Sequence, residues 1–125
     1  MIRLVIAEDH NHLREQLKIL LDTSEWITVV GEADNGKKAV DLCLKLQPDV
    51  VLMDAHMPFI DGFTATEMIR EQMPAIRVVM LSNGSLGEDA RATESGVSAF
   101  LLKPKTTEQI IKTICDVHAN NYIGH

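Results

Sequence analysis

Short apolar runs alternate along this sequence with longer stretches of helical periodicity, and this alternation restricts the fold more than any other feature. The runs occupy residues 2–7, 27–33, 50–53, 78–81 and 99–102. Most of them are continuously apolar, which is typical of strands buried on both faces of a sheet. Five strictly alternating βα units predict a parallel sheet whose right-handed crossovers place helices on both faces.

The number of units also limits the architecture. A chain of 125 residues with 46% apolar residues predicts one domain with one packed interior. Five βα units are too few for the usual barrel of about eight. We therefore expect an α/β fold of the (βα)5 type, with an open, doubly wound, five-stranded parallel sheet between two helical layers. Ligands bind such sheets at the carboxyl ends of the strands.

The stretches between the runs present apolar residues at helical spacing. These sets are Leu13, Leu17, Leu20 and Leu21; Ala39, Leu42, Cys43 and Leu46; Met68 and Ile69; and Ile110, Ile114 and Val117. Capping signals mark the helix ends. Asn35-Gly36 predicts the start of the second helix, and Gly96 predicts a left-handed end of the fourth. Two pairs have capping-box spacing, Ser85 with Glu88 and Thr106 with Gln109.

Charge and hydropathy argue against several classes of protein. The chain carries 12 basic and 18 acidic residues, a net charge of −6, which disfavours direct binding of nucleic acid by this chain. No run approaches the roughly 18 apolar residues of a membrane span. The first apolar run reaches Glu8-Asp9 at once, so a signal peptide is not indicated, and we expect a cytoplasmic protein without a membrane anchor.

The two cysteines and the histidines do not suggest a metal centre of their own. Cys43 and Cys115 are too few for a disulfide framework or a four-ligand site, and they belong to helices expected on opposite faces of the sheet. His10 and His12 have no further His or Cys ligands nearby in the sequence. We expect both at the surface, near the start of a helix.

Polar side chains follow four of the five predicted strands. Glu8 and Asp9 follow the first strand, Asp54 the third, Ser82 the fourth, and Lys103 the fifth. Helix capping explains any one of them. It does not explain three carboxylates at one sheet edge, because like charges repel and raise one another's pKa. A hard cation that prefers oxygen ligands, such as Mg²⁺, would offset that repulsion.

A carboxylate beside Mg²⁺, a hydroxyl and an ammonium suits one reaction in particular. A carboxylate can attack phosphorus and form an aspartyl-phosphate. Phosphoryl transfer chiefly requires positioning and charge neutralisation. Mg²⁺, Lys103 and Ser82 could each serve one phosphoryl oxygen, so the strand ends predict a phosphoacceptor site.

These motifs are similar to those of the receiver domains of two-component response regulators, over essentially the whole chain. They are Glu8-Asp9, then Asp54-Ala55-His56-Met57-Pro58 with Asp61-Gly62, then Leu81-Ser82, then Lys103-Pro104. Residues 2–10 and 29–33 most resemble receivers of the NarL/FixJ (LuxR) type. The resemblance implies one receiver domain over residues 1–125, with a flavodoxin-like fold and strand order 2-1-3-4-5.

The resemblance also implies a role for each site residue. Asp54 is the phosphoacceptor. Asp9, Asp54 and the backbone carbonyl of His56 ligate Mg²⁺ directly, and Glu8 does so through water. Lys103 pairs with Asp54 and then with the phosphoryl group. Ser82 is the switch hydroxyl and Phe100 the switch aromatic, and the bond between Lys103 and Pro104 is cis.

Four positions depart from the commonest family pattern. Glu8 stands where Asp is more frequent, and Phe100 stands where Tyr would offer a hydroxyl. Asn83 follows Ser82 where a small residue is usual, so it could crowd the phosphoryl pocket. His56 lies two residues after Asp54, where a side chain can affect attack by water. We expect these departures to leave the site intact, and the kinetics of phosphorylation and hydrolysis are the property that they put in question.

The implied function is a phosphorylation switch that assists its own phosphotransfer and dephosphorylation, and is not otherwise an enzyme. The implied partners are a sensor histidine kinase, a second copy after phosphorylation, and a helix-turn-helix output domain that regulates transcription. The chain is either a stand-alone receiver or one cut before such an output domain. Three rivals stay open: a flavin-binding module, a Mg²⁺-dependent phosphohydrolase, and a pseudo-receiver that never takes phosphate. The acidic first loop argues against flavin phosphate.

Overall fold

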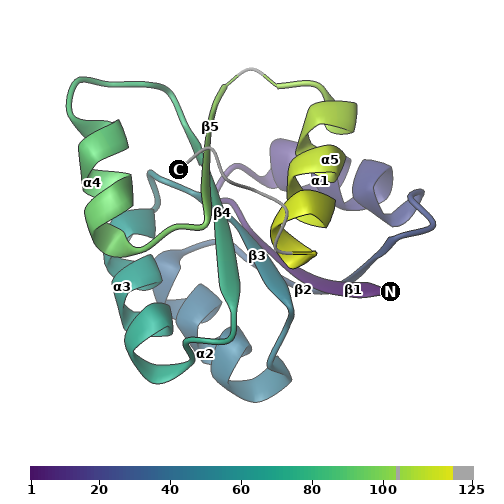
Figure 1. Ribbon diagram of the computed structural model, residues 1–125, viewed down its shortest axis with the longest axis horizontal. Coiled ribbons are helices and arrows are strands. Elements are labelled where there is room, and N and C mark those ends of the chain that lie inside the picture. The colour runs from purple at the N-terminus through teal and green to yellow at the C-terminus, as the bar shows by residue number, and fades with distance from the viewer. Residues whose placement is uncertain (104, 120–125) are drawn as a thin grey trace.

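The structure of the protein is a computed structural model that describes residues 1–103 and 105–119. Strands and helices alternate along this part of the chain (Figure 1). Their bounds are β1 (Ile2–Ala7), α1 (Asn11–Asp22), β2 (Ile27–Ala33), α2 (Gly36–Leu46), β3 (Val50–Asp54), α3 (Gly62–Gln72), β4 (Arg77–Ser82), α4 (Glu88–Ser95), β5 (Ala99–Leu102) and α5 (Thr107–His118). The predicted (βα)5 alternation is confirmed.

The five strands form one parallel sheet in the order β2-β1-β3-β4-β5. The order that the resemblance implied is therefore confirmed. The chain runs outward from β1 to β2 and then returns to β3 on the other side of β1. This reversal places the carboxyl ends of β1 and β3 next to each other, at the point where doubly wound sheets bind ligands.

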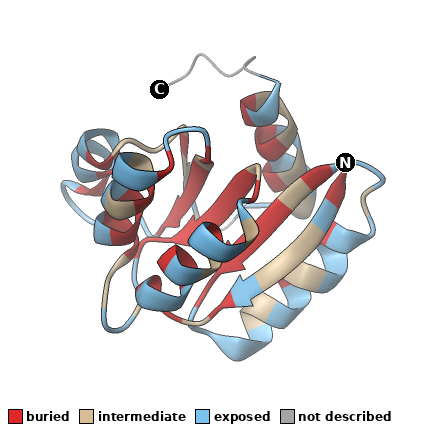
Figure 2. Ribbon diagram, turned by 90° about the horizontal axis from the view of Figure 1, so that it is seen from below, coloured by how far each residue is buried: buried red, intermediate tan, exposed pale blue. Residues whose placement is uncertain are grey.

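Helices cover both faces of the sheet, as the sequence pattern predicts. α1 and α5 pack on one face, while α2, α3 and α4 pack on the other (Figure 1). Each face has its own apolar cluster, and the central strand β3 is buried at every residue (Figure 2). Residues of one strand alternate between the clusters: Leu4 and Ile6 pack toward α1 and α5, while Val5 and Ala7 pack toward α2 and α3.

Most predicted helix ends are confirmed. The Asn35 side chain accepts a hydrogen bond from the Lys38 amide at 2.9 Å and caps α2. Thr106 and Gln109 form the expected capping box at the start of α5. Gly96 ends α4 with a φ of 94°, a left-handed conformation that glycine adopts without a Cβ clash.

The predicted capping box between Ser85 and Glu88 is wrong. Gly87, with a φ of 84°, is the residue that precedes α4, and no side chain caps this end. The Ser85 backbone carbonyl accepts a hydrogen bond from the Glu88 amide at 3.1 Å, so the turn forms without the hydroxyl. The Glu88 side chain is directed instead to the hydroxyl of Ser82.

Two strands extend further than predicted, which brings site residues into the sheet. Asp54 is the last residue of β3 and Ser82 the last residue of β4. Cys43 is a buried residue of α2 and Cys115 lies on α5, on the other face of the sheet, so both thiols are free, as expected. Among the described residues, no helix combines the length and apolar character needed to cross a membrane.

Candidate phosphoacceptor site

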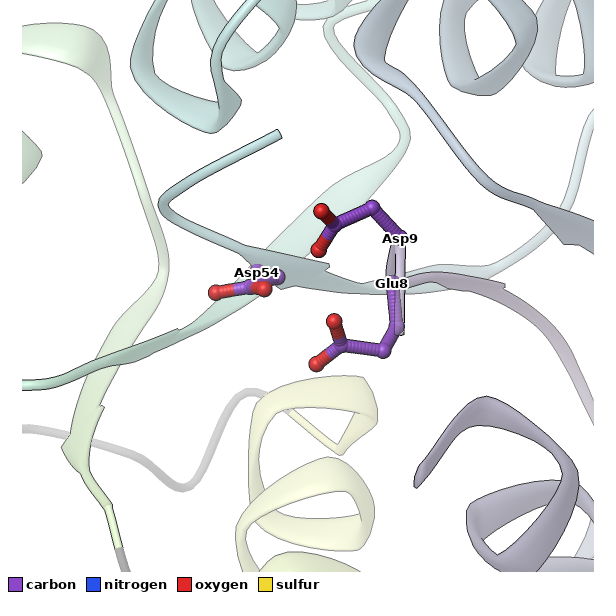
Figure 3. A group of neighbouring side chains, drawn as sticks. All are labelled: Glu8, Asp9 and Asp54. Carbon is purple, nitrogen blue, oxygen red and sulfur yellow. The ribbon is translucent and has the colours of Figure 1, made fainter. Parts of the chain in front are cut away.

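Three carboxylates meet at the junction of β1 and β3. Glu8 and Asp9 follow β1, Asp54 ends β3, and the three side chains point toward one another (Figure 3). One carboxylate oxygen of each lies within 4.8 Å of the others. This is the geometry in which carboxylate oxygens can share one cation. The predicted convergence of Glu8, Asp9 and Asp54 is thus present in the structure.

The carboxylates differ in their exposure to solvent. Glu8 and Asp54 are buried, at 2% and 5% exposure, and Asp9 is exposed at the mouth of the site. The Glu8 Oε2 atom accepts a hydrogen bond from the His10 amide at 3.0 Å. Its Oε1 atom is buried without a hydrogen-bond partner among the described residues. A buried carboxylate oxygen of this kind is a ready acceptor for a cation or for its bound water.

Burial raises the pKa of Glu8 from 4.5 to about 7, because desolvation disfavours the charged carboxylate. The hydrogen bond from the His10 amide lowers this pKa, the neighbouring Asp54 raises it, and the Lys103 ammonium lowers it. Desolvation is the largest of these effects. A cation at the site would reverse the direction, because it stabilises the charged form.

Lys103 extends from the end of β5 across the carboxyl edge of the sheet. Its Nζ atom lies 3.2 Å from Asp54 Oδ1 and 3.5 Å from Glu8 Oε1. Its backbone amide donates a hydrogen bond to the Ser82 carbonyl at 2.7 Å, which anchors the base of the side chain to β4. The ammonium is therefore positioned to neutralise charge that develops next to Asp54. The predicted pairing of Lys103 with Asp54 is present.

Gly62 allows α3 to begin directly against the end of β3. Its amide donates to the Ala55 carbonyl at 2.9 Å. A Cβ atom on Gly62 would lie 2.2 Å from the Asp54 carbonyl oxygen. Only glycine therefore fits here, which explains in physical terms the glycine of the Asp61-Gly62 pair. Asp61 caps α3 by accepting a hydrogen bond from the Thr64 amide at 2.8 Å.

Ser82 and Phe100 lie on adjacent strands beside this cluster. Ser82 is fully buried, and its hydroxyl donates to Glu88 while accepting from the Gly84 amide at 3.0 Å. Phe100 is half-buried on β5 and packs against the apolar cluster of the α2–α4 face. Asn83 is exposed beside Ser82. The switch roles of Ser82 and Phe100 remain predictions.

His56 and Glu88 form a contact that the sequence analysis missed. The His56 amide donates to Asp54 Oδ1 at 3.3 Å, and its Nε2 atom lies 2.5 Å from Glu88 Oε2. Glu88 is buried although it is the first residue of a helix. No sequence signal reveals this contact, because the five-residue loop between β4 and α4 determines where Glu88 points. The cis bond predicted between Lys103 and Pro104 falls outside the described residues.

Comparison with known proteins agrees with this geometry. A family model described as the response regulator receiver domain matches residues 4–115, a span that contains every residue of the cluster. The chain belongs to the response regulator receiver domain family.

Characterised and solved relatives of the receiver support the NarL/LuxR likeness. The transcriptional regulatory protein LnrK of Bacillus subtilis is 35% identical over 98% of this chain and 56% of its own length. The signal receiver domain of the putative response regulator NarL from Mycobacterium tuberculosis has a TM-score of 0.90 at 34% identity, covering 94% of this chain and 96% of that one. A LuxR-family DNA-binding response regulator from Staphylococcus aureus also has a TM-score of 0.90, at 29% identity, covering 94% and 99%. The receiver spans about half the length of the curated relatives it matches.

Proposed function

We propose that this receiver accepts a phosphoryl group on Asp54 and uses it to switch conformation. The observation that supports the proposal best is the convergence of Glu8, Asp9 and Asp54 with the ammonium of Lys103 at one sheet edge. Three carboxylates and one ammonium at the switch point of a doubly wound sheet suit phosphoryl transfer, which depends on positioning and charge neutralisation.

The donor set at this edge fits Mg²⁺. Asp9 and Asp54 would supply direct carboxylate ligands, the His56 backbone carbonyl would supply a third, and Glu8 would act through water. All of these donors are oxygen atoms, which Mg²⁺ prefers, and Glu8 Oε1 has no hydrogen-bond partner of its own among the described residues. When bound, Mg²⁺ neutralises negative charge on the phosphoryl oxygens.

The residues of the chain have separate roles in the transfer and in the conformational change that follows it. An Asp54 carboxylate oxygen attacks phosphorus in line, and a new O–P bond forms as the P–N bond of a phosphohistidine breaks, its electron pair remaining on the departing imidazole. Lys103, 3.2 Å from Asp54 Oδ1, neutralises one oxygen of the transferred group. Ser82 donates its hydroxyl to another oxygen, and Phe100 moves into the space that Ser82 leaves. The α4–β5–α5 surface changes shape as a result.

The partners follow from the family and from the length of its members. A sensor histidine kinase supplies the phosphoryl group in the cytoplasm. The relatives are about twice as long as the matched region, and LnrK is a transcriptional regulatory protein. We therefore propose a helix-turn-helix output domain beyond the receiver of residues 1–125, and a homodimer after phosphorylation. The net charge of −6 favours DNA contact by that output domain and not by the receiver.

Intact mass spectrometry after incubation with acetyl phosphate tests the phosphoacceptor. We expect the mass of one phosphoryl group to appear with Mg²⁺, and to be absent without Mg²⁺ and in Asp54→Asn. Asp9→Asn, which removes a proposed ligand without removing the nucleophile, should shift the reaction to higher Mg²⁺ concentration. Equal phosphorylation of the Asp54→Asn variant would contradict the assignment. Turnover of many phosphate molecules per chain would favour the phosphohydrolase alternative.

A further inference from the structure

The hydroxyl of Ser82 already has two hydrogen-bond partners. It donates its proton to Glu88 Oε1 and accepts from the Gly84 amide at 3.0 Å. A serine hydroxyl has a single proton to donate. While that proton is shared with Glu88, it is not available to a phosphoryl oxygen on Asp54. The two interactions therefore exclude each other.

Glu88 is held in a position that favours this contact. It is 7% exposed and begins α4 after Gly87, which provides no side-chain cap. A carboxylate in the first turn interacts favourably with the amide groups of a helix start. Its second oxygen, Oε2, lies 2.5 Å from His56 Nε2 in the loop that follows β3. One buried carboxylate thus connects the end of β4, the start of α4 and the β3–α3 loop.

We propose that Glu88 is a positioning residue that holds the Ser82 hydroxyl away from Asp54 until a phosphoryl group competes for it. This inference rests on the proposed function, since it assumes that Asp54 carries the phosphoryl group. It assigns to Glu88 a share of the free-energy difference between the inactive and active conformations. Phosphorylation can shift that equilibrium only through contacts that differ between the two states. The Ser82–Glu88 hydrogen bond is such a contact.

The proposal predicts tighter binding of a phosphoryl mimic when Glu88 no longer accepts the hydroxyl proton. Glu88→Leu removes both acceptor oxygens and replaces the carboxylate with an apolar side chain of similar size. Glu88→Gln removes the charge and keeps one acceptor oxygen. Because a hydrogen bond to a charged group is about twice as strong as one between neutral groups, the affinity of Glu88→Gln should fall between those of the unchanged chain and Glu88→Leu.

The experiment measures the dissociation constant of beryllofluoride in the presence of Mg²⁺ by calorimetry. It uses the unchanged chain, Glu88→Gln and Glu88→Leu, each with Ser82 and with Ser82→Ala. Circular dichroism checks that each variant is folded. We expect about tenfold tighter binding for Glu88→Leu and a smaller gain for Glu88→Gln. In the Ser82→Ala background, all three affinities should agree within about twofold.

Other outcomes would overturn the proposal in distinguishable ways. Unchanged affinity in both variants would show that Glu88 does not restrain Ser82. A gain in beryllofluoride affinity that persists in the Ser82→Ala background would show that Glu88 acts only through its charge near the anion. An equal gain in affinity for Glu88→Gln and Glu88→Leu would show the same. If none of the chains bound beryllofluoride, the phosphoacceptor function itself would fail, and the proposed role of Glu88 with it. If Glu88→Leu does not fold, the proposal is tested by Glu88→Gln alone, compared with and without Ser82→Ala.

Discussion

Replacing Gly62 by alanine should destabilise the receiver by pushing α3 away from the phosphoacceptor strand. The added Cβ would lie 2.2 Å from the Asp54 carbonyl oxygen and 2.9 Å from the Ala55 Cα atom. Both are backbone atoms, so rotation of a side chain cannot relieve the clash. Either the first turn of α3 or the end of β3 must move.

The size of this effect follows from two opposing contributions. Overpacking of a close-packed region costs about 1–3 kcal/mol. Alanine favours a helix over glycine by at most about 1 kcal/mol in a helix interior, and Gly62 is only the first residue of α3. Because the obstacle is backbone, we expect the free energy of unfolding to fall by about 2–3 kcal/mol. For a domain of this size, that lowers Tm by on the order of 10 °C.

Urea unfolding followed by circular dichroism measures the change, and Gly87→Ala is the matched control. Gly87 has a φ of 84° and no atom within 4 Å of its added Cβ. Its substitution therefore costs only the left-handed backbone strain, about 1–2 kcal/mol. Acetyl phosphate labelling should also slow in Gly62→Ala and not in Gly87→Ala, because only the first variant displaces Asp54. The steric argument would be refuted if Gly62→Ala lowered the free energy of unfolding no more than Gly87→Ala does and left the rate of acetyl phosphate labelling unchanged.

Three further predictions concern single groups. Glu8→Gln should stabilise the Mg²⁺-free protein at pH 8 by up to about 3 kcal/mol. The reason is that the pKa of Glu8, raised to about 7 in the native state, makes that state lose stability as pH rises from 4.5 to 7. Urea titrations at pH 4 and pH 8 should show the gain in stability only at pH 8. Thr106→Ala should cost about 1 kcal/mol through loss of the α5 cap, while Ser85→Ala, at the disproved capping box, should change thermal stability by less than about 0.5 kcal/mol. Cys43, whose pKa burial raises to about 12, should react with a thiol reagent far more slowly than the half-buried Cys115, and equal rates in a time course would contradict the burial argument.

The fold could be predicted from the sequence because local and global signals agree. Continuous apolar strands, helical spacing between them and caps such as Asn35 all favour the same βα succession. The carboxylate cluster followed from the same reasoning, since parallel strands bring their carboxyl ends to one edge. Strand ends were less certain: Asp54 and Ser82 belong to the strands because backbone pairing continues through polar residues.

The contact of Glu88 with Ser82 and His56 could not be predicted in this way. Spacing along the chain predicts a local partner for Glu88, namely the hydroxyl of Ser85, which lies three residues before it. The left-handed turn at Gly87 starts the helix without a side-chain cap, and the carboxylate is directed inward to Ser82. Local rules describe residues within one turn of a helix, whereas this contact depends on how α4 packs against the end of β4.

The charge balance at the carboxyl edge explains why transfer should require Mg²⁺, whereas the packed interior does not depend on it. Glu8, Asp9 and Asp54 can carry three negative charges, and Lys103 contributes one positive charge close to two of them. A phosphoryl group on Asp54 would add about −1.5 to −2 charges at this edge. Transfer without another cation would therefore bring an anionic group toward an already negative site. The apolar clusters on both faces of the sheet contain none of these four residues. Unfolding should accordingly remain cooperative in a chelator, under conditions in which phosphorylation of Asp54 ceases.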